Sequence, residues 1–180
     1  MKKYIFTSER LGFRNWIESD KEPYAKMNAD KEVMEFFPNT KTKKASFEQV
    51  TRFQKHFTDF GFTFFAVDVL ETKEFIGFIG MINTNFKADF TPCVEIGWRL
   101  QKKFWGFGYA TEGAKRCLVY GFNELGFNEI VSITPLKNIK SEKVMQKIGM
   151  QKQGTFKHPQ IEDGHWLKTE LLYKIKKKSK

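Results

Sequence analysis

The sequence predicts a single α/β domain with a mixed, mostly antiparallel central sheet, and two observations favour it. Strand-like and helical periodicities alternate along the chain without an internal repeat, a low-complexity linker or a boundary to a second domain. A strand at Cys93–Leu100, a helix at Ala110–Leu125 and a strand at Glu129–Thr134 form a crossover unit. Such a unit normally joins parallel neighbours, whereas the other strands are joined by short turns and should pair antiparallel. We therefore expect one parallel pair, 93–100 beside 129–134.

The first forty residues are expected to hold a strand and two short helices. Side chains alternate over Arg10–Trp16, which predicts the first strand. Asp20 is suited to cap a helix that runs to about Asn28. A second helix is expected over Asp30–Phe37, where apolar residues recur at helical spacing and a proline follows.

The central part is expected to hold a long helix and a β-hairpin. Phenylalanine and valine recur three or four residues apart over Lys43–Phe60, and Gly61 follows as a C-terminal stop. Phe62–Val69 and Phe75–Ile82 are rich in β-forming residues and are separated by a short polar turn, which predicts an antiparallel hairpin. Asn83–Pro92 is expected to be a polar, mobile loop.

The last third is expected to begin with a short helix and end with a second hairpin. The periodicity of Ser141–Ile148 is helical, and Gly149 ends it. Lys152–Lys157 and Trp166–Ile175 read as the two strands of the hairpin.

Length and composition are those of a cytoplasmic globular domain. The 180 residues suffice to bury a core in one domain spanning 1–180. No apolar run is long enough to cross a membrane, and the apolar start at 1–6 ends too soon for a signal peptide, so no membrane partner is expected. Cys93 and Cys117 lie in predicted buried elements and fit neither a disulfide framework nor a metal site. No metal is expected either, because no metal-ligand spacing links the histidines His56, His158 and His165.

The chain carries a net charge of +10, part of it in a basic tail at about 176–180. Such a tail is usually solvated. The remaining positive charge would attract an anionic cofactor or an RNA-rich neighbourhood. No RNA-binding motif is present and aromatic residues do not interleave with the tail, which argues against nucleic acid as the partner. A homodimer stays open at this stage.

Two glycines between a predicted strand and a predicted helix point to an anion site. In the stretch Trp98–Glu112, an extended segment turns through Gly106 and Gly108 before the helix begins. Glycines let backbone N–H groups approach an anion, and a helix N-terminus adds unpaired donors and a partial positive charge. Lys102 and Lys103 precede the turn and should raise the positive potential. A diphosphate would suit this loop, although two glycines before a helix also occur as a simple tight connection.

The neighbours of this loop extend the pattern, with Glu95–Trp98 upstream and Asn138–Ser141 downstream. The set resembles the GNAT N-acetyltransferases, and most closely their RimJ/RimL-like branch, which includes ribosomal-protein N-terminal acetyltransferases. The family's pyrophosphate loop, Gln/Arg-x-x-Gly-x-Gly/Ala, corresponds to Lys103–Gly108, with lysine in the first position. The branch's longer form, Trp-Gly-x-Gly-Tyr-Ala-Thr-Glu, is present at Trp105–Glu112, and the resemblance runs over Ser8–Tyr173.

The resemblance implies a GNAT acyltransferase fold in which acetyl-CoA lies in a V-shaped gap between the strands 93–100 and 129–134. The pyrophosphate would sit on backbone amides of the glycine loop, the pantetheine arm would pair with the backbone of the first strand, and Asn138 would bond the arm from the other side. Phe36, Phe37 and Pro38 would lie at the acceptor end of the cleft, with core packing as the equal alternative. The acetyl-CoA-binding residues expected on this basis are Ile96, Gly97, Trp98, Arg99, Leu100, Lys103, Phe104, Trp105, Gly106, Phe107, Gly108, Tyr109, Ala110, Thr111, Asn138 and Ser141.

Acetyl transfer to an amine requires the amine to be neutral beside the thioester. At pH 7 an α-amine with a pKa near 7.8 is neutral in roughly one molecule in seven, and a lysine with a pKa near 10.4 in about one in 2,500. Glu95 is the candidate base, and a surface carboxylate paired with Arg99 on the same strand face is the equal alternative. Ser141 is the candidate donor to the departing thiolate, and it is also suited to cap the following helix. Many family members place a tyrosine acid four residues later, and Met145 excludes that role here.

The resemblance therefore predicts an N-acetyltransferase that transfers acetyl from acetyl-CoA directly to a primary amine. A protein N-terminal α-amine is the first candidate for the acceptor, because its basicity demands only a weak base. A small-molecule amine, such as a polyamine or an aminoglycoside, is the alternative acceptor. A non-catalytic module that binds acyl-CoA or RNA is the alternative of another class.

Overall fold

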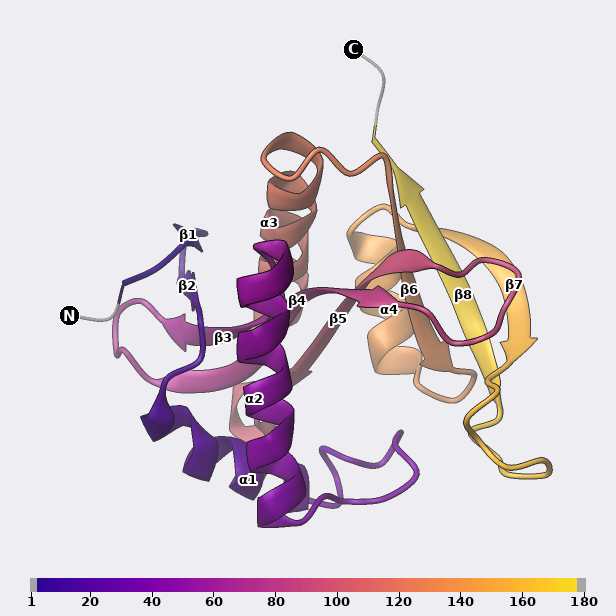
Figure 1. Ribbon diagram of the computed structural model, residues 1–180, viewed down its shortest axis with the longest axis horizontal. Coiled ribbons are helices and arrows are strands. Elements are labelled where there is room, and N and C mark those ends of the chain that lie inside the picture. The colour runs from indigo at the N-terminus through magenta and orange to yellow at the C-terminus, as the bar shows by residue number, and fades with distance from the viewer. Residues whose placement is uncertain (1–2, 178–180) are drawn as a thin grey trace.

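An eight-stranded sheet in the order β1-β2-β3-β4-β5-β6-β8-β7 runs through the computed structural model, which describes residues 3–177 (Figure 1). β5 and β6 are its parallel pair, and the other neighbours pair antiparallel, which confirms the predicted sheet. The strands are β1 (Phe6–Thr7), β2 (Leu11–Arg14), β3 (Phe64–Val69), β4 (Phe75–Thr84), β5 (Cys93–Leu100), β6 (Glu129–Pro135), β7 (Gln151–Lys157) and β8 (Thr169–Lys176).

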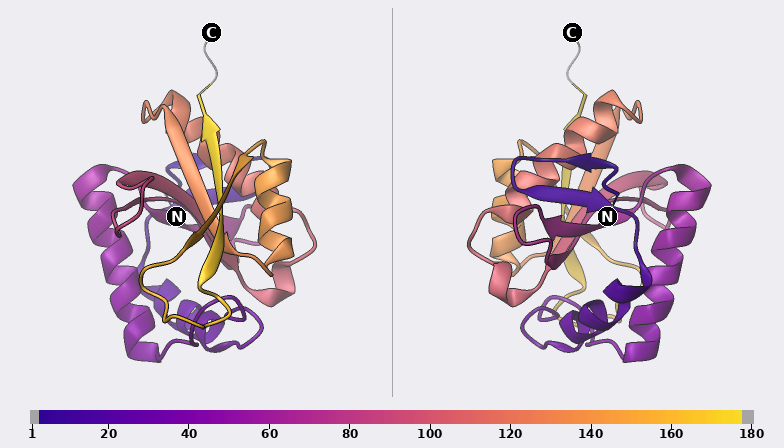
Figure 2. Two further views of the ribbon diagram at one scale, coloured as in Figure 1. Left: turned by 90° about the vertical axis from the view of Figure 1, so that its right-hand side faces the viewer. Right: turned by 90° about the vertical axis from the view of Figure 1, so that its left-hand side faces the viewer.

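Helices cover both faces of the sheet, and Figure 2 shows α2 on one side with α3 and α4 on the other. An aromatic-rich cluster that includes Trp16, Tyr24 and Phe53 fills the space beneath the first two helices. A second, more aliphatic cluster lies beneath α3 and α4 and includes Ile79 and Met145. The helices are α1 (Lys21–Ala29), α2 (Lys43–Phe60), α3 (Tyr109–Asn123) and α4 (Ile139–Lys147), with short 3-10 turns at η1 (Glu18–Asp20) and η2 (Lys102–Phe104).

The sequence predicted α2 and β5 at the bounds that the structure has. The Thr42 hydroxyl accepts a hydrogen bond from the Ala45 N–H at 3.1 Å and so caps the start of α2. Gly61 ends the helix in the left-handed conformation, with φ of +77°. These local signals therefore determine where the long helix begins and ends.

The helix expected over Asp30–Phe37 is wrong, because this segment forms a series of turns. The Asp30 carboxylate accepts hydrogen bonds from the backbone N–H groups of Glu32, at 2.9 Å, and Val33, at 3.4 Å. An aspartate that bonds its own following backbone in this way competes with helix formation. The apolar spacing instead reflects the burial of Val33 and Met34 beneath the turns.

The proposed side-chain cap by Asp20 is also wrong, although α1 follows it directly. The Asp20 carboxylate accepts two hydrogen bonds from the Arg14 guanidinium, at 2.6 and 2.8 Å. Asp68 of β3 accepts two more from Arg14, at 2.7 and 2.8 Å. Burial of Arg14 is thus offset by two carboxylates, which is the arrangement that a buried cation needs.

The loop between β4 and β5 is held against β7 by aromatic rings. The first part of the polar loop expected at 83–92 extends β4 to Thr84. The ring of Phe90 lies 4.9 Å from that of Phe156, and Phe86 lies 4.6 Å from His158. The loop is therefore packed across the end of the sheet.

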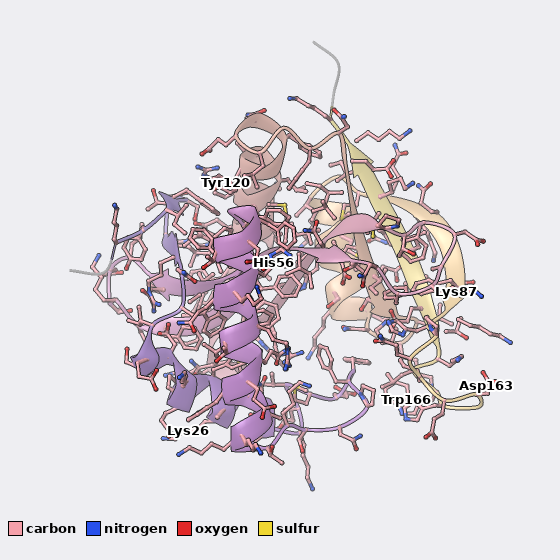
Figure 3. The ribbon with its side chains drawn as sticks, in the orientation of Figure 1. Lys26, His56, Lys87, Tyr120, Asp163 and Trp166 are labelled. Carbon is pink, nitrogen blue, oxygen red and sulfur yellow. The ribbon has the colours of Figure 1, made fainter. Side chains whose placement is uncertain are left out.

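His56 joins α2 to the strands beneath it (Figure 3). Its Nε2 accepts the backbone N–H of Asn83 at 3.1 Å, so its Nδ1 carries the proton and donates to the Phe62 carbonyl at 2.7 Å. This histidine therefore has a structural role.

Other parts of the chain bear on location and charge. No helix in the described residues is both long enough and apolar enough to span a membrane. Cys117 is buried and Cys93 half-buried, and both are free thiols. Of the predicted basic tail, Lys176 ends β8, and 178–180 lie outside the described residues.

The two parallel strands separate soon after they meet. β5 and β6 share one bridge, Glu95 with Val131, and the Ser132 hydroxyl then donates to the Ile96 carbonyl at 3.0 Å. Beyond that point Gly97–Leu100 pairs with β4 alone, while β6 pairs with β8. The β5 backbone is therefore left with a free edge that faces the opening of a V.

Candidate active site

A cleft of about 660 Å³ opens along this edge of β5, between α4 and the turns that follow α1. Its volume lies in the range of small-molecule sites. Of the residues expected to bind acetyl-CoA or the acceptor, these line the cleft: Phe36, Phe37, Trp98, Arg99, Leu100, Phe104, Trp105, Gly106, Gly108, Tyr109, Ala110, Thr111, Asn138 and Ser141. The expected residues that do not line it are Pro38, Glu95, Ile96, Gly97, Lys103 and Phe107.

The glycine loop has the backbone that an anion site requires. Gly106 and Gly108 have φ of +84° and +81°, a conformation that side chains with a Cβ rarely adopt. A Cβ added at Gly106 would meet no described atom within 4 Å, so the space above this glycine is open. Gly108 precedes α3 without a side-chain cap, which leaves the first N–H groups of the helix without intrahelical partners. The Trp105 indole fixes the loop by donating to the Leu100 carbonyl at 2.9 Å.

The acidic residue in the first turn of α3 is neutralised. The Glu112 carboxylate accepts hydrogen bonds from the Ser8 hydroxyl at 2.6 Å and from the Arg10 Nε at 2.7 Å. These partners hold the pKa of Glu112 below its usual value despite partial burial. Its charge is therefore balanced and does not oppose an anion at the helix start.

The positive charge beside the loop comes from α4 rather than from the predicted lysines. Neither of these lysines lines the cleft: Lys102 pairs with Glu32 of the cleft mouth at 2.7 Å, and Lys103 pairs with Glu74 outside it. The cleft is lined instead by lysines of α4, one of which lies with its Nζ 4.6 Å from the centre of a Trp105 ring. The sequence carries the signal for this stripe in the helical spacing of Lys140, Lys143 and Lys147.

Asn138, and not Ser141, caps α4. The Asn138 Oδ1 accepts the backbone N–H of Ser141 at 3.2 Å, which corrects the alternative role of this serine. The Ser141 hydroxyl lines the cleft and makes no hydrogen bond with another described residue. It is therefore available to a ligand, as is the Asn138 amide nitrogen.

Glu95 lies at the base of the V. It is half-buried, it accepts a hydrogen bond from the Thr84 hydroxyl at 2.8 Å, and burial raises its pKa to about 7. The alternative ion pair with Arg99 is absent from the described residues, because the Arg99 guanidinium bonds Asn28 instead. Glu95 and Gly97 lie on the same face of β5. A Cβ added at Gly97 would lie 3.1 Å from the Phe64 ring, so this face is the one that α1 and α2 cover. An amine that approached from that side would meet this carboxylate.

Two aromatic side chains enclose that side of the cleft. Phe36 packs edge-on against Trp166, with ring centroids 6.0 Å apart, and Figure 3 shows Trp166 in the loop that leads to β8. The Arg99 guanidinium lies over the Phe37 ring at 3.9 Å. Segments distant in sequence therefore meet at this end of the cleft.

The remaining histidines contact backbone. The Nδ1 atoms of His158 and His165 accept the N–H groups of Gln160 and Leu167, at 3.2 and 3.1 Å. Within residues 3–177, no group of three or more His, Cys, Asp or Glu side chains is placed to hold a metal ion.

The site thus combines an anion-binding helix start, a free strand edge, a free hydroxyl and a carboxylate with a pKa near neutrality. Such a set can hold an extended anionic molecule and move a proton.

Comparisons with known proteins agree with this geometry. The family described as Acetyltransferase (GNAT) domain matches residues 10–151. The uncharacterized protein YkkB of Bacillus subtilis is 31% identical over 128 residues, which are 71% of this chain and 73% of YkkB. The putative ribosomal N-acetyltransferase YdaF of Bacillus subtilis is 31% identical over 75 residues, 42% of this chain and 41% of YdaF. The crystal structure of a GNAT-family acetyltransferase from Bacillus anthracis superposes with a TM-score of 0.78 at 28% identity, covering 94% of this chain and 96% of that one.

Proposed function

This chain belongs to the GNAT acetyltransferase family, and from that premise we propose that it acetylates an α-amine, with a protein N-terminus as the first candidate. As a member of the family it is an acetyltransferase that uses acetyl-CoA. We assign it to the RimJ/RimL-like branch on the run Trp105–Glu112 and on its similarity to YdaF.

One observation carries the acetyl-CoA part of the proposal: the open glycine loop continues directly from a free strand edge. The glycine loop would suit the diphosphate of acetyl-CoA, and the edge of β5 would suit its pantetheine arm. A diphosphate would accept hydrogen bonds from the unpaired N–H groups after Gly108, and the open space over Gly106 admits it. The pantetheine arm would pair with the backbone of β5 around Trp98, on the edge that β4 does not use, as an added strand would.

The lysine stripe gives the first test of this placement. Replacing Lys140 and Lys143 together by glutamine should weaken acetyl-CoA binding by about 3- to 10-fold at low ionic strength, because two exposed cations near phosphates contribute modestly. The loss should shrink as salt is added, and calorimetric titration at two salt concentrations measures both effects. Lys103→Gln is the matched control, since this lysine pairs with Glu74 outside the cleft, and its affinity should stay at the wild-type value. An equal loss in the control would contradict the assignment.

Bound acetyl-CoA supplies an activated acetyl group, and the residues of the chain move the protons. Glu95 would accept a proton from the attacking amine, directly or through a water, as the new N–C bond forms. The Ser141 hydroxyl would donate a hydrogen bond to the sulfur as the C–S bond breaks and its electron pair leaves on the thiolate. No covalent bond to the enzyme is needed, because both reactants can be held in one cleft.

Ser141→Ala tests the second of these roles. A hydrogen bond to a charged group is worth about 1.5–3 kcal/mol, so turnover should fall by roughly 10- to 100-fold at every pH. Stability should change little, because Asn138 makes the cap, whereas Asn138→Ala should cost about 1 kcal/mol of unfolding free energy. Steady-state kinetics and thermal melts of both variants separate the roles. A Ser141→Ala enzyme that melts earlier but turns over normally would assign this serine to structure alone.

The basicity of the acceptor favours an α-amine. Glu95 has a pKa of about 7, close to the roughly 7.8 of an α-amine, so proton transfer between them is nearly balanced. A lysine side chain would need a much stronger base. YdaF supports a ribosomal protein as the source of the amine, since its name describes a ribosomal N-acetyltransferase.

A small-molecule amine is the second candidate, and one observation favours it. Phe36 lines the cleft and packs against Trp166, so an aromatic pair would border the bound acceptor. An acceptor panel decides between the two: thiol release from acetyl-CoA is followed with N-terminal peptides, with polyamines and with aminoglycosides. Peptides should be turned over fastest, and release with polyamines or aminoglycosides alone would contradict the first candidate.

A further inference from the structure

The chain buries two arginines on the α1–α2 side of the sheet, and their surroundings differ. Arg14 is 2% exposed and donates four hydrogen bonds to the carboxylates of Asp20 and Asp68. Arg99 is 7% exposed, and no carboxylate of the described residues forms an ion pair with it. A buried cation without an anion is costly, because the loss of hydration is not repaid. Of these two buried arginines, Arg99 is therefore the one without a counter-ion among the described residues.

The Arg99 guanidinium has N–H groups without hydrogen-bond partners among the described residues. One nitrogen, Nη1, donates to the Asn28 Oδ1 at 2.7 Å. The Nε is fully buried and has no hydrogen-bond partner among the described residues. The planar group lies over the Phe37 ring at 3.9 Å, which fixes its orientation, and the side chain lines the cleft. An oriented guanidinium with free donors is the usual receptor for a carboxylate, which it binds through two parallel hydrogen bonds.

Other cations lie near Arg99, and the acids of the cleft mouth do not neutralise it. Burial together with the charges of Arg99 and Arg52 lowers the pKa of Lys41, so these three groups share one region. Of the acids that line the cleft, Glu32 pairs with Lys102 and Glu35 is exposed at the rim. Arg99 therefore lies near other cations, and no carboxylate of the cleft mouth pairs with it.

We propose that the Arg99 guanidinium binds a carboxylate of the acceptor, so that the substrate class is an α-amine with an acidic group nearby. This inference rests on the proposed acetylation of an α-amine. The carboxylate would come either from a free amino acid or from an acidic residue close to a peptide N-terminus. A polyamine, which carries only cations, would be repelled by the same group.

Two matched acceptor pairs test the inference and separate the sources. Alanine is compared with alaninamide, and the C-terminally amidated dipeptide Ala-Glu with amidated Ala-Gln. The kcat/KM of each acceptor is measured with the wild type and with Arg99→Gln. For each enzyme, the preference within a pair is the kcat/KM of the acceptor with the carboxylate divided by the kcat/KM of the acceptor without it. The ratio of the wild-type preference to the variant preference cancels differences in amine basicity.

We expect this ratio to be at least about tenfold in one pair, because a site built for a polar group rejects an analogue that lacks it. A high ratio in the alanine pair indicates a free amino acid, and a high ratio in the dipeptide pair indicates an acidic N-terminus. Arg99→Lys should keep only part of the preference, since lysine retains the positive charge but cannot donate two parallel hydrogen bonds to one carboxylate. Arg116→Gln is the matched control and should leave both ratios unchanged, because Arg116 bonds the Thr7 carbonyl and Glu124 away from the cleft.

The outcomes separate this inference from the proposed function. Acetylation of alaninamide and Ala-Gln with both ratios near one would overturn the role of Arg99 and leave the proposed function standing. No acetylation of any of the four acceptors by the wild type would overturn both. If Arg99→Gln does not fold, the wild-type preferences for alanine over alaninamide and for Ala-Glu over Ala-Gln decide alone, and preferences near or below one in both pairs overturn the inference.

Discussion

Glu95→Gln should lower kcat by about 10²–10⁴-fold at pH 7, because the substitution keeps the size of the side chain and removes the base. In the wild type the rate should rise with pH through about 7, as the Glu95 carboxylate loses its proton. The variant should lack that rise and recover part of its activity at higher pH, where the α-amine is already neutral. Acetyl-CoA affinity should barely change, since Glu95 does not line the cleft. A pH–rate profile from pH 6 to 9, with calorimetry, measures these effects.

The matched control for this variant is Glu170→Gln. Burial and the Glu95 charge raise the pKa of Glu170 to about 8, so it is a second acidic group with a pKa near neutrality. Its replacement should change kcat by no more than a few-fold. Wild-type turnover in Glu95→Gln across the pH range would show that bulk water takes the proton.

Stability offers an independent check on the protonation of Glu95. Its folded pKa of about 7 lies above the roughly 4.3 of an unfolded glutamate, so the contribution to stability is complete below that lower value and is lost as pH rises through 7. Replacing Glu95 by glutamine should therefore raise the melting temperature relative to the wild type more at pH 8 than at pH 5. Equal shifts at both pH values would contradict the raised pKa.

Gly108→Val should weaken acetyl-CoA binding by more than about 100-fold, equivalent to roughly 2.7 kcal/mol. A β-branched residue is strained at φ of +81°, and its side chain would stand where the phosphates approach the N–H groups of α3. Calorimetric titration of the folded variant measures the loss.

Gly126→Val separates backbone strain from the ligand effect. Gly126 has φ of +74°, and a Cβ there would meet no described atom within 4 Å, but it follows α3 at the far end from the cleft. Both variants should melt earlier than the wild type, since each forces a side chain into the left-handed region. Only Gly108→Val should lose affinity, and unchanged affinity in that variant would remove the basis for the diphosphate site.

The sequence predicted most elements because their signals are local. The apolar spacing of α2, its cap at Thr42 and its stop at Gly61 lie within a single segment, and the alternation of β5 is equally self-contained. The errors arose where a polar side chain had a choice of partners. The Asp20 side chain bonds Arg14 instead of capping the helix, and the Asp30 side chain bonds the backbone that follows it. The spacing of apolar residues alone predicts neither of these partners.

The parts of the candidate site that are contiguous in sequence were predictable, whereas its contacts between distant segments were not. The glycine loop and the free edge of β5 are contiguous in sequence, so one motif places both. The pairing of Lys103 with Glu74, by contrast, depends on how distant turns pack together. The isolation of Arg99 from any carboxylate and the meeting of Phe36 with Trp166 likewise exist only in the folded chain.

The most direct test of direct transfer follows the acetyl group itself. The wild-type enzyme is mixed with acetyl-CoA, first alone and then with the best peptide from the acceptor panel, and free thiol, acetylated amine and intact enzyme mass are quantified together. We predict no rapid thiol release without the amine, thiol and acetylated amine in equal amounts with it, and an unchanged enzyme mass throughout. A burst of thiol without the amine, matched by an acetylated enzyme, would contradict transfer within one ternary complex.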